Sequence, residues 1–491
     1  WNNSSGDWRW YGDVSISQVE DYSYGFYSRR AETWDRIAMN NPRYLICKAA
    51  GNDRGKNHAG THEVLINNRW ETSTAERDTV GPYDCIATYA IAKNILTVGA
   101  VRKINDGWTK PSDVIMTSFS GWGPADDGRI KPDVVAPGQD LRSSTDGSDD
   151  EYKSFRGTSM AAPVVSGSLL LLQEQYQQRH FGALMMASAL KGLTIHTTDE
   201  AGAAPGPDYQ YGWGLVNIPR AVALIKDGQA YNIQQRTLGN KRSFTQSYHV
   251  DGSEPVKVTV CWTDPPGKPV APALDPTDLM LVNDLDIRLI RKSDSTVFYP
   301  YILNPATPAA AATTGDNFRD NVEQIFIAAP QPGGYRLVVT HKNELHEGEP
   351  QIYSLILSGV EPVAPVADFT VEKLTVCTNE PIRFTDASEN DPHSWDWLLT
   401  GASLYRTATA SQVAVSYSAP GIYTIDVSLK VSNYGGEDSI KRTVTVEVLE
   451  RPADIQVSGN QQSMAHREEV YTVSNTSGST YAWHIENGTV Q

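Results

Sequence analysis

One serine of this chain, Ser159, is well placed to act as a nucleophile. It lies in the string GTSMAAP at 157–163, directly ahead of an apolar helical pattern. Free N–H groups and the dipole at the start of a helix stabilise developing negative charge, as acyl transfer by a hydroxyl requires. Gly157 leaves room for a substrate, and Pro163 is expected in the first turn, where its missing N–H costs little. Taken alone, a serine in this position is more often an N-cap.

The surrounding strings favour the nucleophile. GTSMAAPVVSG at 157–167 resembles the serine block of the subtilase family, and AAGN at 49–52 resembles its oxyanion segment. A third string, at 119–138, is also subtilase-like, and the three occur in the family's order. The resemblance implies a serine endopeptidase in which Ser159 attacks the scissile carbonyl. Asn52 and the Ser159 N–H would then hold the oxyanion.

The same resemblance implies two substrate-binding segments. One would pair with the substrate backbone as an added β-strand, and the other would form a wall of the specificity pocket. They are Ser4, Ser5 and Gly6, and Ala49, Ala50 and Gly51, respectively.

The general base is harder to find. A nucleophilic serine needs a histidine that is oriented by a carboxylate, and in subtilases both precede the oxyanion asparagine. No histidine precedes Asn52 here. His58 and His62 follow it, in an expected surface loop, and a metal pair there would lack a third ligand. Asp13 and Asp21 are poor substitutes for the triad carboxylate. We therefore expect the catalytic Asp and His upstream of Trp1, and this chain alone to be inactive.

The elements predicted before residue 225 alternate. Apolar strands are expected at 43–50 and 95–101, and helices at 31–40, 166–178 and 184–193. This alternation predicts a mostly parallel sheet with helices on both faces, the partial α/β domain that a subtilase would have at 1–228.

Strand patterns dominate after residue 227, and no helix of consequence is expected there. Runs at 256–262, 285–290, 324–328, 335–340 and 353–357 predict an antiparallel sandwich or barrel at 229–360. Strings in 257–359 resemble the C-terminal β-barrel (or jelly roll) of calcium-binding, oxidation-resistant alkaline subtilases. Structural calcium is expected there, although acidic turn residues are common without a metal. The candidate ligands are Asp284, Asp286, Asp316, Asp320 and Glu323.

A Pro-rich linker at 360–366 precedes a segment, 367–448, that resembles a PKD domain, an immunoglobulin-like β-sandwich. Trp395 and Trp397 in this segment predict either core packing or a binding platform. A further β module, cut short, is expected from 452, with strands near 471–473 and 481–483. The predicted domains are therefore 1–228, 229–360, 361–450 and 451–491.

Composition narrows the class of protein. A net charge of −16 argues against nucleic acid or an anionic membrane as partner, and no apolar run is long enough to span a bilayer. Cys47 and Cys85 fall in one predicted domain, and their pairing stays open. We expect a secreted or cell-surface bacterial monomer that acts on protein or peptide substrates, with PKD-like modules that contact surfaces, polysaccharides or proteins. The alternative is a non-catalytic adhesion protein with a degenerate protease domain; an esterase would need a G-x-S-x-G elbow, which is absent.

Overall fold

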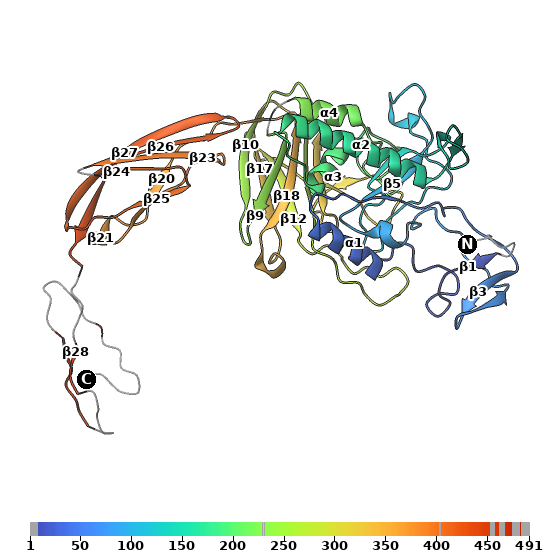
Figure 1. Cartoon of the computed structure of the whole chain (residues 1–491), viewed down its shortest axis with the longest axis horizontal. Helices are drawn as coiled ribbons and strands as arrows, with labels where there is room; N and C mark the ends of the chain where they lie inside the picture. The colour runs from blue at the N-terminus through green and yellow to red at the C-terminus, as the bar shows by residue number, and fades with distance from the viewer. Residues whose placement is uncertain are drawn as a thin grey trace. The chain divides into compact units, whose positions relative to one another are not determined.

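The computed structural model describes residues 8–227, 229, 231–401, 404–451, 457–460, 467–473 and 482. The chain divides into two compact units, Trp1–Val363 and Ala364–Gln491. The predicted boundaries at 228/229 and 450/451 fall inside these units, and the four-domain division stays a prediction. Each unit is described by itself below (Figure 1).

Unit 1 opens with an α/β part. Its parallel sheet has the order β2-β5-β6, with β2 at Cys47–Ala49, β5 at Leu96–Val101 and β6 at Val134–Pro137. The first predicted strand is shorter than expected because residues 41–44 form a turn, closed by Tyr44 N–H donating to the Asn41 carbonyl at 2.8 Å. The predicted parallel sheet is confirmed.

The helices of this part lie close to their predicted positions. Helix α2 packs on all three strands of the sheet, and α3 packs against the β-sandwich that follows (Figure 1). Their bounds are α1 Arg29–Asn40, α2 Thr158–Arg179, α3 Ala187–His196 and α4 Ile218–Lys226, with short 3-10 turns at Thr88–Ile91 and Pro111–Asp113. In the described residues after α4, the only helical turn is the 3-10 turn His346–Gly348.

Two small sheets flank the α/β part. One has the order β1-β3-β4 and the other is the hairpin β7-β8. Their strands are β1 Arg9–Trp10, β3 His62–Ile66, β4 Arg69–Ser73, β7 Leu141–Ser144 and β8 Tyr152–Phe155. The region of His58 and His62, predicted as a surface loop, thus leads into a hairpin.

The second part of unit 1 is an antiparallel β-sandwich of two separate sheets rather than one closed barrel. The sheets have the orders β13-β12-β17-β10-β19 and β16-β11-β18-β9. The strands are β9 Ile233–Leu238, β10 Phe244–Val250, β11 Val256–Trp262, β12 Leu285–Arg291, β13 Val297–Phe298, β16 Val322–Ile327, β17 Gly333–His341, β18 Gln351–Ser358 and β19 Glu361–Pro362, with a separate pair β14 Tyr301–Ile302 and β15 Thr313–Thr314. Because β19 pairs with β10, the segment predicted as a linker is partly built into the sheet.

The two parts of unit 1 share a packed interface. Strand β11 is buried on both faces: Val258 and Val260 belong to the core of the sandwich, whereas Cys261 belongs to the core beneath α3. Gly192 of α3 lies against Cys261 and Ile356, where an added Cβ would be 2.7 Å from the Ile356 side chain. A glycine at this position lets the helix approach the sheet closely.

Unit 2 contains a second β-sandwich, in agreement with the immunoglobulin-like prediction. Its sheets have the orders β20-β22-β25 and β21-β27-β26-β23-β24, and a small pair β28-β29 follows. The strands are β20 Phe369–Val371, β21 Thr375–Cys377, β22 Ile382–Asp386, β23 Ser394–Gly401, β24 Leu404–Ala408, β25 Gln412–Val415, β26 Gly421–Asn433, β27 Gly436–Leu449, β28 Val457–Ser458 and β29 Thr472–Val473. Of the predicted final strands, 481 and 483 lie outside the described residues.

The two tryptophans of β23 pack in this sandwich. Trp397 is fully buried, and its Nε1 donates to the Ala410 carbonyl at 2.8 Å, while Trp395 packs partly buried against the same core. The core-packing interpretation is therefore confirmed for Trp397.

In the described part of the chain, no helix is both long and apolar enough to cross a membrane. All four cysteines, Cys47 and Cys85 among them, are free thiols.

Candidate active site

Ser159 is the second residue of α2 and is exposed at the start of this helix. The helix is entered through Gly157, whose φ of 148° lies in a region that side chains rarely adopt. Gly157 N–H donates to the Gly138 carbonyl at 2.8 Å and so fixes the entry of the chain. A nucleophile at this position has the amino-terminal dipole of a 22-residue helix beneath it.

Asn52 lies beside this helix start, three residues after β2 ends. Its Oδ1 accepts from the Thr158 N–H at 2.8 Å and from the Thr158 hydroxyl at 3.0 Å. The Thr158 hydroxyl in turn accepts from the Gly51 N–H at 3.2 Å. The structure therefore brings the two predicted catalytic residues together, and it adds Thr158, which sequence reasoning did not single out although it precedes Ser159.

Two hydrogen-bond donors remain available at this place. Among the described residues, neither the Ser159 N–H nor Asn52 Nδ2 has a hydrogen-bond acceptor. Asn52 Nδ2 would lie 3.5 Å from a Cβ placed on Gly157, so the glycine leaves the space in front of the amide open. Two unpartnered donors beside an exposed hydroxyl can hold an oxyanion.

The position of Pro163 differs from the prediction. Helix α2 begins at Thr158, and its first i to i+4 hydrogen bond already runs from the Ala161 N–H to the Gly157 carbonyl at 3.4 Å. Pro163 lies beyond this bond, inside the helix. Its missing N–H would otherwise have bonded the Ser159 carbonyl, four residues earlier. The backbone therefore carries a gap in its hydrogen bonding next to the nucleophile.

The loop at 119–138 supports the site from below. Gly121 N–H donates to the Gly51 carbonyl at 3.1 Å, and the Ser120 hydroxyl accepts from the Ala100 N–H at 2.9 Å. An added Cβ on Gly121 would lie 2.8 Å from the Cys85 carbonyl and 3.1 Å from that of Ala50. This close approach explains why a glycine is needed beside the oxyanion segment.

The predicted substrate-binding residues are only partly described. Ala50 is buried and its N–H donates to the Val98 carbonyl at 3.0 Å, which extends the pairing of β2 with β5 by one residue. Ser4, Ser5 and Gly6 lie outside the described residues.

No histidine nitrogen hydrogen-bonds the Ser159 hydroxyl among the described residues. His58 Nε2 contacts the Thr61 carbonyl at 3.1 Å and its ring stacks on Trp8. His62 Nδ1 contacts the Gly60 carbonyl at 2.8 Å, and its Nε2 accepts from Arg77 at 3.3 Å. Both rings are engaged by residues in and around the small sheet β1-β3-β4.

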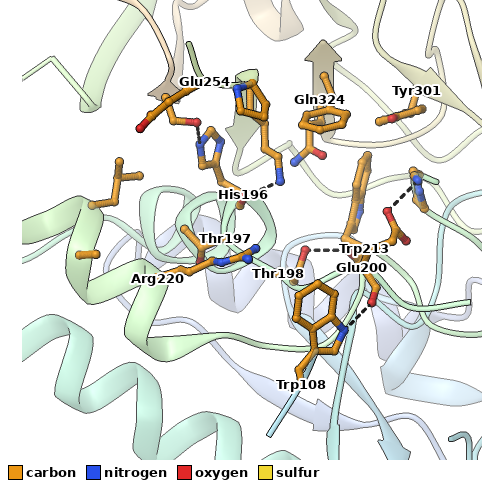
Figure 2. Close-up of a pocket in the computed structure, with 18 of the residues that line it drawn as sticks. Trp108, His196, Thr197, Thr198, Glu200, Trp213, Arg220, Glu254, Tyr301 and Gln324 are labelled. Carbon is orange, nitrogen blue, oxygen red and sulfur yellow. Dashed lines mark hydrogen bonds between the residues drawn. The ribbon is translucent and has the colours of Figure 1, made fainter. Parts of the chain in front are cut away.

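A third histidine, His196, lines a cavity of about 910 Å³ that does not include Ser159 or Asn52 (Figure 2). Its two ring nitrogens lie 2.9 Å from the Thr259 hydroxyl and 3.0 Å from the Ser358 hydroxyl. Burial, with the nearby Lys257 ammonium, lowers the pKa of His196 well below its ordinary value. The ring is therefore a neutral group that joins α3 to the sandwich.

The predicted calcium ligands of the sandwich fall into two groups. Lys342 Nζ lies 3.0, 3.3 and 2.7 Å from carboxylate oxygens of Asp284, Asp286 and Asp316, and Arg288 pairs with the last two. Two cationic side chains thus already supply the charge that calcium would bring, and the set does not favour an ion.

The other two predicted ligands bind backbone. Asp320 accepts from the Ile130 N–H at 2.8 Å, and Glu323 accepts from the Ile287 N–H at 2.7 Å. Calcium in the sandwich therefore stays a prediction.

The comparisons with known proteins point to one protein family for the α/β part. Residues 1–214 match the model of the subtilase family, Peptidase_S8. A C5a peptidase of Streptococcus pyogenes serotype M6 is 48% identical over 151 residues, which are 28% of this chain and 13% of that protein. The serine protease/ABC transporter B family protein tagD of Dictyostelium discoideum is 24% identical over 383 residues, 56% of this chain and 21% of that protein. The chain thus spans about a fifth or less of these relatives.

Solved structures also resemble parts of the chain. The match to the patellamide maturation protease PatA has a TM-score of 0.30 at 23% identity. The aligned region covers 42% of this chain and 59% of the PatA chain. The PKD1 domain of Vibrio anguillarum Epp gives a TM-score of 0.14 at 26% identity, and it covers 18% of this chain and 99% of that chain. Both scores are too low to support a conclusion by themselves.

Proposed function

Because residues 1–214 match the model of the subtilase family, we propose that this chain carries the nucleophile and the oxyanion donors of a secreted bacterial serine endopeptidase. The observation that supports this is the pair of hydrogen bonds from Thr158 to Asn52 Oδ1. They hold the Asn52 side chain at the start of α2, where Ser159 is exposed.

In the proposed reaction a histidine, oriented by a carboxylate, takes the Ser159 proton while the oxygen attacks the scissile carbonyl. The Ser159 N–H and Asn52 Nδ2 hold the resulting oxyanion. The same histidine protonates the leaving amine, and water then releases the acyl group. Because no described histidine reaches Ser159, the proposal requires this base and its carboxylate to come from residues other than these.

The proposed substrates are proteins or peptides. Ala49, Ala50 and Gly51 would line the pocket for the side chain on the acyl side, and the segment of Ser4, Ser5 and Gly6 would pair with the substrate backbone. The similarity to C5a peptidases supports a protein substrate. The sandwich of unit 2 would contact surfaces, polysaccharides or proteins, and the chain would act as a monomer.

The experiment tests separately whether Ser159 is the nucleophile and whether this chain contains the general base. The 491-residue chain alone should show no Ser159-dependent hydrolysis of casein. In an active enzyme that contains this chain, Ser159→Ala should abolish hydrolysis, and Asn52→Ala should lower kcat by about 10²–10³, as for the corresponding donor of subtilisin. Ser168→Ala is the matched control, because this serine lies on the same helix and bonds only the Val164 carbonyl.

Two outcomes would contradict the proposal. Ser159-dependent cleavage by the chain alone would show that it already holds a base. An enzyme with a complete triad that hydrolyses nothing would favour the adhesion alternative.

A further inference from the structure

Four acidic side chains of unit 1 converge from segments far apart in the sequence. Three of the segments are joined by backbone hydrogen bonds: Gly25 N–H to the Ile86 carbonyl at 2.9 Å, Asp126 N–H to the Gly25 carbonyl at 3.1 Å, and Asp84 N–H to the Gly123 carbonyl at 2.9 Å. These segments carry Glu20, Asp84 and Asp126. The fourth segment, ahead of β12, carries Asp275 and is tied to the others by Met280 N–H, which donates to Asp127 at 3.2 Å.

The carboxylates share one small volume. One oxygen each of Glu20, Asp84 and Asp275 lie within 4.8 Å of one another. Asp126 is next to them, because a Cβ placed on Gly25 would collide with both Asp84 Oδ1 and Asp126 Oδ1. Gly25 has a φ of 70°, so this backbone conformation and the absence of a side chain together let the two carboxylates approach.

Among the described residues, Arg129 acts on Asp126 through space, but its ion pair is with Asp127. None of the ion pairs among the described residues includes any of the four carboxylates. Asp84 Oδ1 and Asp126 Oδ2 are moreover buried without a hydrogen-bond partner. A buried carboxylate without a partner is strongly unfavourable, so this arrangement differs from the sandwich cluster around Lys342.

The electrostatics of the cluster agree with this picture. Burial, with the nearby Asp275 and Glu20 charges, raises the pKa of Asp84 to about 8. Burial and the Asp84 charge raise the pKa of Asp126 to about 9. Burial and the close approach of the carboxylates thus disfavour their charged forms.

We infer that Glu20, Asp84, Asp126 and Asp275 bind a calcium ion. Calcium accepts six to eight oxygen ligands at about 2.3–2.6 Å in irregular geometry, and ligands on opposite sides of one ion then lie about 5 Å apart. Magnesium instead keeps several waters and usually takes one or two carboxylates in strict octahedral geometry. A cage of several carboxylates from four segments fits the larger ion.

The ion would stabilise the support of the active site. The segment that ends in Asp126 also contains Gly121, which donates to the Gly51 carbonyl beside Asn52. Calcium would therefore join the segments of Glu20, Asp84 and Asp126 to the segment ahead of β12, and the Gly121 hydrogen bond would connect this cross-link to the oxyanion segment. This site shares no residue with the calcium set that the sequence predicted.

The experiment uses the 491-residue chain freed of metal with EDTA and desalted. Thermal unfolding is followed as CaCl2 or MgCl2 is added, and isothermal titration with CaCl2 gives the stoichiometry. We expect calcium to raise the unfolding temperature of unit 1 saturably by several degrees, with a much smaller effect of magnesium.

Four variants locate the ion. Asp84→Asn should abolish the calcium-dependent rise and at the same time raise the unfolding temperature of the metal-free chain, because it removes repulsion; a misfolded variant could not show this gain. Asp275→Asn, an exposed position with φ of 46° that asparagine tolerates, should also remove one bound ion. The exposed Asp149→Asn and the sandwich variant Asp316→Asn should keep the response.

The inference is overturned if calcium stabilises Asp84→Asn and Asp275→Asn as much as the unsubstituted chain. It is equally overturned if the unsubstituted chain does not respond to calcium, or if Asp316→Asn alone loses the response.

Discussion

At the scale of single residues, the interior of the α/β part relies on buried charge. Asp133, which directly precedes β6, accepts from the Thr97 N–H at 2.6 Å and pairs with Lys131 at 2.7 Å and Lys191 at 2.9 Å. All three charged side chains are almost completely buried. Because Lys191 belongs to α3 and Thr97 to β5, this one carboxylate joins a helix and two strands beneath the active-site sheet.

Removing this carboxylate should be costly. Asp133→Asn leaves two buried ammonium groups without their counter-charge, and we expect the free energy of unfolding of unit 1 to fall by about 3–5 kcal/mol. Urea unfolding at pH 7 measures it, with the exposed Asp146→Asn as control, for which we expect a change within about 0.5 kcal/mol. A loss below about 1 kcal/mol for Asp133→Asn would contradict the prediction.

The buried ion pairs of Asp133 also make the stability of unit 1 depend on pH. Burial opposes the charged form of Asp133, but Lys131 and Lys191 outweigh it, so the pKa of Asp133 is lowered. Its stabilising contribution is therefore complete above the ordinary carboxyl pKa of about 3.9 and is lost as the pH falls through its lower folded value. The difference between the unsubstituted chain and Asp133→Asn should persist at pH 5 and shrink in acid, as urea titrations across that range would reveal.

At the scale of elements, helix α2 carries Ser159 at its start and has one buried face and one exposed face. Ala161, Val165, Leu169 and Leu172 are buried against the sheet with the helical period, whereas Leu170 and Leu171 are exposed. The buried face packs the helix on the sheet, and this packing fixes the position of Ser159 next to Asn52.

Two neighbouring leucines of α2 test this division. Leu169 is 4% exposed and Leu170 is 72% exposed. We expect Leu169→Ala to lower the free energy of unfolding by about 2–5 kcal/mol, and Leu170→Ala to change it by no more than about 0.5 kcal/mol. Urea unfolding of both variants measures the contrast. Similar losses for both would show that the exposed face is packed in solution.

At the scale of the whole molecule, the sequence was informative where local pattern determines structure. The helix ending at Asn40, the strand ending at Val101 and the sandwich strand starting at Val256 follow directly from apolar periodicity and turn residues. The meeting of Ser159 with Asn52 followed from short strings with a fixed chemical role.

What the sequence could not predict depends on contacts between distant segments. Asp284, Asp286 and Asp316 were predicted as calcium ligands because their sequence is rich in turn residues, but the Lys342 side chain folds back onto all three. Asp84, Asp126 and Asp275 look like ordinary turn residues, and only the folded chain places them together without a cation. Partners of this kind carry no local signal in one sequence.

The two compact units should also unfold in separate transitions. Trp397 is fully buried in unit 2, bonds the Ala410 carbonyl, and meets Phe369 edge-on at 5.7 Å. Trp397→Ala removes this contact and should lower the stability of unit 2 by about 3–5 kcal/mol, enough to shift its unfolding temperature by more than about 10 °C.

Because none of these contacts belongs to unit 1, the transition that responds to calcium should keep its temperature. Differential scanning calorimetry distinguishes the two transitions, with Leu398→Ala, on the more exposed side of the same strand, as the mild control. A parallel loss in both transitions would show that the units unfold as one, which would contradict their independence.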